Sequence, residues 1–143
     1  MNKLKLEEVS ELIRQTHIAV SGFYNEFAKS VGMTLAEFKV LAIIWKEETS
    51  TQKRITQMTY LPKQTVNAII MGFLKKGFIE LMESNLDKRN KVISFTNMGQ
   101  KYADKIILKA KEIEYNALSA LGEERIKLFL EAITMYKNNL KME

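Results

Sequence analysis

The hydrophobic period of this chain changes directly after Gly77. Before this point and again beyond residue 96, apolar residues recur every three or four positions, which is typical of amphipathic helices. Between them, residues 78–83 and 91–95 read as two short strands joined by the polar, partly charged residues 84–90. We therefore expect a mainly α-helical fold that carries a small β-hairpin.

Several helix ends are marked by residues with defined terminal roles. Thr34 and Glu37 have the spacing of a capping box, in which each residue binds the other's backbone N–H. Pro62, the one proline, suits the first turn of a helix, and Gly77 supplies a left-handed residue after a helix end. The predicted helices cover about 5–29, Thr34 to about Trp45, 52–59, 62–76, Thr96 to about Ala117, and a final segment after Gly122 that carries Ile126 to Leu140.

The order of these elements is helix, helix, short helix, helix, hairpin, helix, helix. Two sequential helices with a tight turn, followed by a two-stranded hairpin, describe a winged helix-turn-helix. We place this unit at 34–96, with the helix-turn-helix at about 51–76 and the wing at about 78–95.

The outer segments, 1–30 and 97–143, carry heptad-like apolar stripes. In the first segment the stripe recurs every seven residues, at Leu6, Ile13, Val20 and Phe27. Such stripes are typical of helices that pack between subunits. We therefore expect one domain, 1–143, with N- and C-terminal dimerisation helices.

The net positive charge of the chain is concentrated in its middle third. The formal net charge is +5, and residues 50–91 hold eight basic and three acidic side chains, so the rest of the chain is balanced. A localised basic surface is typical of proteins that bind polyanions. The alternative is a solvated lysine-rich surface without a partner.

Several classes of site lack the residues that they need. The chain has no cysteine, which excludes disulfides, thiolate zinc sites and thiol-based redox sensing, and its one histidine, His17, disfavours a multi-histidine metal site. No glycine-rich phosphate loop, paired-carboxylate motif or nucleophile–base signature is present, so we expect neither an enzyme nor a cofactor. No apolar run approaches the about 20 residues of a membrane span, and the start lacks the apolar core of a signal peptide. We expect a cytoplasmic protein with no membrane partner.

Three stretches of the chain resemble the MarR family of transcriptional regulators. Residues 86–99 are similar to that family's wing, which has the pattern Asp-x-Arg, a strand, then hydrophobic-Thr-x-x-Gly. Residues 73–80 resemble the end of its recognition helix, and residues 32–41 the entry to its second helix. The resemblance implies a homodimer that binds a near-palindromic double-stranded DNA operator, most often as a repressor, and that a small aromatic effector can release.

In the predicted wing, Arg89 lies at the loop tip, where a planar guanidinium can enter the narrow, negative minor groove of DNA. Asp87 has the spacing to pair with Arg89 and orient it. Lys88 and Lys91 are expected to bind phosphates, with Asn90 between them also a candidate DNA contact. The alternative is an exposed loop arginine without a role.

The predicted recognition helix exposes polar residues in its first turns, where base edges are usually reached. Amide side chains can bond bidentately to adenine, and a threonine methyl can contact a thymine methyl. The alternative is that these residues only solvate a surface helix. The candidate DNA contacts in this helix are Lys63, Gln64, Thr65 and Asn67.

The chain also departs from the family pattern. Many members carry arginine where Ala68, Gly72 and Leu81 stand here, and alanine where Thr56 stands. The recognition helix is therefore less basic than usual, and we expect more of the DNA binding to fall on the wing.

The family's effectors bind in a crevice between the dimerisation helices and the DNA-binding lobe. His17, Tyr24 and Trp45 are candidates to line it, although aromatic residues at helical spacing usually belong to the core. Two other functions stay open at this point. One is a winged-helix protein-interaction module without a specific operator, and the other, without a supporting motif, is a small catalytic domain.

Overall fold

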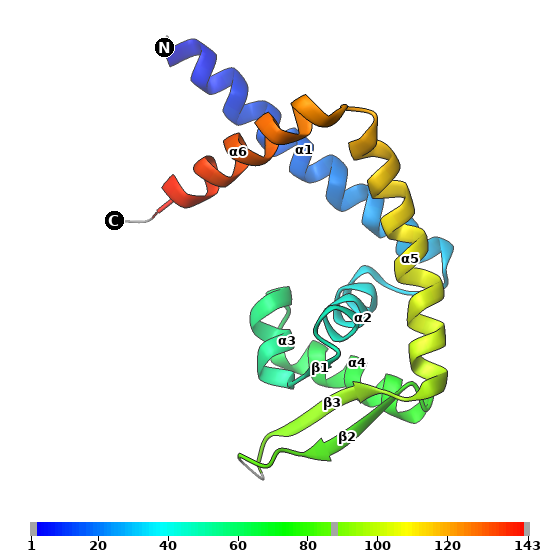
Figure 1. Ribbon diagram of the computed structural model, residues 1–143. Helices are drawn as coiled ribbons and strands as arrows, with labels where there is room; N and C mark the ends of the chain where they lie inside the picture. The colour runs from blue at the N-terminus through cyan, green and yellow to red at the C-terminus, as the bar shows by residue number, and fades with distance from the viewer. Residues whose placement is uncertain (1–2, 87–88, 142–143) are drawn as a thin grey trace. The chain divides into compact units, whose positions relative to one another are not determined.

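The computed structural model describes residues 3–86 and 89–141 and shows a mainly helical chain with a small sheet, as predicted (Figure 1). Its contacts group the chain into two compact units, Met1–Ile106 and Ile107–Glu143, which are considered separately. The predicted helices and both wing strands are present, with boundaries shifted by only a few residues. The elements in chain order are α1 (Lys3–Ser30), α2 (Leu35–Glu47), β1 (Thr49–Ser50), α3 (Gln52–Thr59), α4 (Lys63–Lys75), β2 (Ile79–Glu83), β3 (Lys91–Phe95), α5 (Asn97–Ser119) and α6 (Glu123–Asn139).

The sheet has a third strand that the sequence did not predict. β1 pairs antiparallel with β3, which pairs antiparallel with β2, so the strand order is β1-β3-β2 (Figure 1). Ser50 of β1 lies opposite Ile93 of β3 and is buried. A two-residue strand is too short to show a hydrophobic period, so periodicity does not predict it. This pairing ties the residues before α3 to the wing.

Helices α3 and α4 form the helix-turn-helix around a shared apolar cluster. The Thr51 side chain caps α3 by accepting from the N–H of Arg54, and Tyr60 ends that helix with a left-handed φ of 56°. Pro62 then precedes α4. Fully buried side chains from α2, α3 and α4 are Val40, Leu41, Ile44, Ile55, Val66 and Phe73. Because one face of α4 is buried in this cluster, the face that it presents to solvent is determined.

The wing joins α5 through a hydrogen-bonded turn. Thr96 Oγ1 donates to the carbonyl oxygen of Gly77 at 2.6 Å and accepts from the N–H of Gly99 at 3.0 Å. The rings of Phe78 and Tyr102 stack with centroids 4.3 Å apart. A Cβ at position 99 would lie 1.7 Å from the carbonyl oxygen of Phe78, so glycine is required there. The hydrophobic-Thr-x-x-Gly motif therefore encodes the geometry of this junction.

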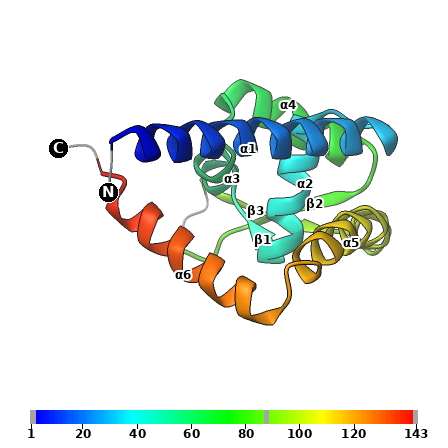
Figure 2. The ribbon, with the colours of Figure 1, turned by 90° about the horizontal axis from the view of Figure 1, so that it is seen from above.

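Helices α1 and α6 leave most of their apolar side chains exposed. Figure 2 shows α1 as one unbroken helix, and Val9, Ile13 and Val20 along it are exposed. No residue of α6 is buried, and Phe129 is 51% exposed. In the described part of the chain, no helix is long and apolar enough to cross a membrane.

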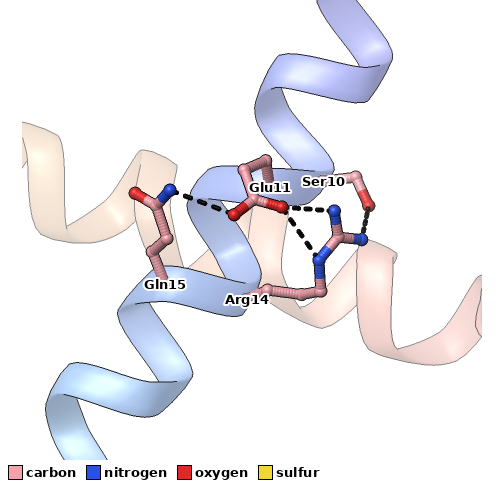
Figure 3. Close-up of polar contacts among 4 residues, drawn as sticks. All are labelled: Ser10, Glu11, Arg14 and Gln15. Atoms are coloured by element: carbon pink, nitrogen blue, oxygen red, sulfur yellow. Dashed lines mark hydrogen bonds and ion pairs between the residues drawn. The ribbon is translucent and has the colours of Figure 1, made fainter.

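A polar cluster lies on one turn of α1. Glu11 accepts hydrogen bonds from Arg14 and from Gln15, and Arg14 Nη1 donates to Ser10 Oγ at 3.2 Å (Figure 3). The hydrogen bond from Arg14, followed by that from Gln15, lowers the pKa of Glu11. These exposed residues are three or four positions apart, so the cluster supports the helix itself.

Candidate nucleic-acid interface

A groove lies between α3, α4 and the wing, which comprises β2, residues 84–90 and β3. Four basic side chains line it: Lys53 from α3, Lys63 from α4, and Arg89 and Lys91 from the wing. All four residues are exposed, and the groove brings them together although they are up to 38 positions apart in sequence. A concave surface lined by several cations attracts a polyanion.

Part of the groove lining is apolar. Ile70 and Met71 of α4, Leu81 of β2 and Ile93 of β3 contribute to it. The groove therefore has cations at several points around uncharged surface.

Five of the eight residues predicted to contact DNA line this groove. Gln64 and Thr65 lie in the first turn of α4 outside the groove lining, Gln64 exposed and Thr65 half-buried. Lys88, and Asp87 as the residue predicted to orient Arg89, lie outside the described residues. The five residues in the groove are Lys63, Asn67, Arg89, Asn90 and Lys91.

The N-terminus of α4 opens beside the groove. Among the described residues, no side chain caps this helix, and the carbonyl oxygen of Pro62 accepts from the N–H of Val66. The amides of Lys63, Gln64 and Thr65 in the first turn are not bonded within the helix. Such a helix end attracts anions through its N–H groups and its dipole.

Sequence reasoning missed the contribution of α3. Gln52, Lys53 and Gln57 of this helix also line the groove. The signal was present in the sequence, because Lys53 and Gln57 are four residues apart, on the side of α3 away from the buried Ile55 and Thr59.

An ion pair joins the end of α2 to α3. Arg54 Nε lies 2.8 Å from Glu47 Oε1, and Ser50 Oγ donates to Glu47 Oε2 at 2.9 Å. The hydrogen bond from Arg54, followed by that from Ser50, holds the pKa of Glu47 below its usual range. Since Ser50 belongs to β1, this carboxylate connects α2, the sheet and the first helix of the helix-turn-helix.

A second pocket, of about 410 Å³, lies between α1, α2 and the end of α3. His17 and Tyr24 of α1 line it, as does Tyr60 of the turn before α4. Trp45 is placed elsewhere, and its Nε1 donates to Asp104 Oδ1 of α5 at 2.7 Å. Of the three residues predicted for an effector crevice, the structure brings His17 and Tyr24 together.

Comparison with known proteins identifies relatives of this architecture. The family model described as MarR family matches residues 33–91, which include α2, α3, α4 and most of the wing. A MarR family protein from Bacillus stearothermophilus has a similar structure, with a TM-score of 0.79 and 17% identity over 98% of each chain. Residues 33–91 of this chain are thus similar to the MarR family, and the whole fold is shared with a protein of that family.

Further relatives agree with this similarity. NMB1585, a MarR family regulator from Neisseria meningitidis, is 25% identical, with a TM-score of 0.70 over 96% of this chain and 93% of its own. The organic hydroperoxide resistance transcriptional regulator of Bacillus subtilis is 25% identical over 84 residues, 59% of this chain and 57% of that protein. This chain thus spans just over half the length of the curated relatives that it matches.

Proposed function

We propose that this chain is a sequence-specific DNA-binding transcriptional regulator that acts as a homodimer. The groove is the observation that carries this proposal, because cations from α3, α4 and the wing line it together with exposed amide side chains. The similarity of residues 33–91 to the MarR family supports it, since the curated relatives are named as transcriptional regulators.

In this proposal the first turns of α4 enter a major groove, and the wing reaches the neighbouring minor groove. Arg89 enters the minor groove, where the potential is most negative. Lys53, Lys63 and Lys91 neutralise phosphates and supply affinity that is independent of sequence. The uncapped start of α4 contributes backbone N–H donors to a phosphate.

The homodimer is supported by the apolar surface of the terminal helices. Val9 and Ile13 are exposed on α1, and Phe129 and Ile133 are exposed on α6. Exposed apolar patches of this kind mark interaction sites. In the proposed dimer these stripes contact a second copy of the chain. Two copies of α4, related by a two-fold axis, then match half-sites about 34 Å apart in a near-palindromic operator.

Sedimentation equilibrium tests the dimer directly. We expect a mass of twice 16.5 kDa at micromolar concentration. A single 16.5 kDa species under these conditions would contradict the dimer.

We also propose a repressor that is relieved by a small aromatic effector bound in the second pocket. The pocket volume of about 410 Å³ suits a small molecule. Tyr60 lines this pocket three positions before the first residue of α4, Lys63. A ligand that binds more tightly to one conformation of the turn at Tyr60 would shift the equilibrium between positions of α4.

A panel of phenols and benzoates, titrated into the protein–duplex complex, tests the effector. We expect at least one to release the duplex, and His17→Ala to weaken that release. If none of them binds the protein in calorimetry, the proposal of an aromatic effector fails.

The test of the DNA interface is Arg89→Ala on a duplex that the protein itself selects from a random pool. We expect binding to weaken about ten- to a hundredfold, because the wing loses its minor-groove contact. The matched control is Lys101→Ala on α5, which removes an exposed charge that does not line the groove and should change affinity by less than about twofold. Both variants should sediment like the parent.

Two results would overturn this assignment. An unchanged affinity for Arg89→Ala would remove the wing from the interface. The second result is a selection that enriches no sequence, with every duplex bound equally and with an affinity set only by counterion release. That result would indicate a winged-helix interaction module without a specific operator.

A further inference from the structure

The exposed side of α4 carries an uncharged stripe. Gln64, Asn67, Ala68 and Met71 follow the spacing i, i+3, i+4, i+7 of a single helical face, and all four are exposed, Met71 by 52%. Asn67 and Met71 also line the groove. Resting on the DNA-binding function proposed above, we propose that this stripe reads an A·T-rich half-site in the major groove.

The chemistry of the stripe matches the edges of A·T pairs. A Gln or Asn amide bonds bidentately to adenine N6 and N7, and a small apolar group contacts the thymine methyl. Gln64 and Asn67 supply the two amides, and Ala68 and Met71 supply apolar surface beside them. Each class of group on this face therefore has a partner on an A·T pair.

The cations of α4 are outside the middle of this stripe. The basic residues of the helix are Lys63 at its first position and Lys75 at its last. Arginine makes the commonest specific contact to guanine, and α4 contains no arginine. Guanine reading by a guanidinium from α4 is thus excluded.

The packing of α4 prevents another face from replacing this one. Val66, Ile70 and Phe73, on the opposite side of the helix, are buried, and α4 contacts α2, α3 and β2. Rotating α4 to present different side chains would expose these residues to water, at a cost of about 1.5–3 kcal/mol for each large side chain.

The cations beside the stripe have a different role from the stripe itself. Lys53 and Lys91, from α3 and β3, line the same groove as Asn67 and Met71. A lysine that binds phosphate adds affinity on any sequence. Discrimination among bases is left to the uncharged groups of α4.

The first experiment is selection of 30-base-pair duplexes from a random pool by the purified full-length protein. We expect enriched half-sites in which the positions protected in the major groove are A·T pairs. Enriched half-sites with G·C at those positions would overturn this inference while leaving the proposed function intact. No enrichment at all would overturn the proposed function first.

The second experiment replaces single atoms in the selected duplex. Substituting 7-deaza-adenine removes only the N7 acceptor and should weaken binding about tenfold at a contacted adenine. Substituting deoxyuridine for thymine removes only the methyl group and should weaken binding about two- to fivefold. Full affinity for both modified duplexes would overturn the inference.

Two matched variants test whether the stripe on α4 is what recognises the adenine. In Asn67→Ala, the duplex with adenine and the duplex with 7-deaza-adenine should bind equally at the contacted position, because the amide that distinguishes them is gone. Lys63→Ala is the control, and it should weaken both duplexes by the same factor and reduce the salt dependence. If Lys63→Ala instead changes the preferred sequence, the lysine reads a base and the inference fails.

Discussion

The helix-turn-helix and the terminal helices differ in how far their apolar side chains are buried within one copy of the chain. Leu41, Ile55 and Phe73, from three helices of the winged unit, are fully buried within one copy of the chain. In α6, by contrast, no residue is buried, and Phe129 and Leu128 are exposed. Both regions have amphipathic sequences, so amphipathicity alone does not reveal which stripe finds its partner within the chain.

This difference separates folding from association. A side chain buried within one copy contributes to the stability of that copy, whereas an exposed apolar stripe contributes only when another surface covers it. Substitutions in the two regions should therefore change different measured quantities.

The largest difference is expected between two phenylalanines. Phe73→Ala leaves a cavity among fully buried side chains and should lower the free energy of unfolding by about 3–5 kcal/mol in urea titrations. Phe129→Ala, on exposed α6, should change it by less than about 1 kcal/mol at concentrations where the protein is monomeric, and should weaken self-association. Equal losses of monomer stability would contradict the comparison.

Two glycines should give effects of opposite sign. Gly99→Ala forces a Cβ against the carbonyl oxygen of Phe78, so the junction between the wing and α5 must shift, at about 2–3 kcal/mol. Gly22→Ala places its Cβ where nothing lies within 4 Å and should stabilise α1 by about 0.5–1 kcal/mol. Thermal unfolding of both variants measures this, and a Gly99→Ala protein as stable as the parent would refute the junction geometry.

The smallest effect is expected from acid. The folded state lowers the pKa of Glu47, so its ionised form stabilises the fold at pH values above its ordinary pKa of about 4.3, and this contribution is lost as the pH falls through the lowered pKa. Glu47→Gln should therefore lose less stability than the parent on acidification.

Glu123→Gln is the matched control for this titration. Glu123 is an exposed glutamate of α6 that pairs with Lys127, and exposed pairs contribute little to stability. The control should follow the parent's acid curve. If Glu47→Gln follows it too, the ion pair with Arg54 does not stabilise the helix-turn-helix.

Features decided by near neighbours in the chain could be predicted. The capping box between Thr34 and Glu37 forms as expected, and Gly77 adopts a positive φ of 72° after α4. Each depends on a few adjacent residues, so composition and spacing are sufficient. The face of α4 that carries Asn67 follows in the same way from the helical period.

Features decided by distant contacts could not be predicted. β1 exists because two polar residues meet β3 more than 40 positions later. Trp45 binds Asp104, 59 positions away, rather than joining His17 and Tyr24 at the second pocket. Periodicity predicts which face of a helix or strand a side chain lies on, but it does not predict which distant residue that side chain contacts.

By itself, the sequence determined the helices, the two wing strands and the concentration of positive charge in residues 50–91, because each depends on local spacing or on counting. Only the tertiary structure decided that Lys53, Lys63, Arg89 and Lys91 line one groove together with Met71. The physical reason is packing. Burial of α4 against α2 and α3, together with the pairing of β1 and β3, brings these separate segments together, and no segment carries that information alone.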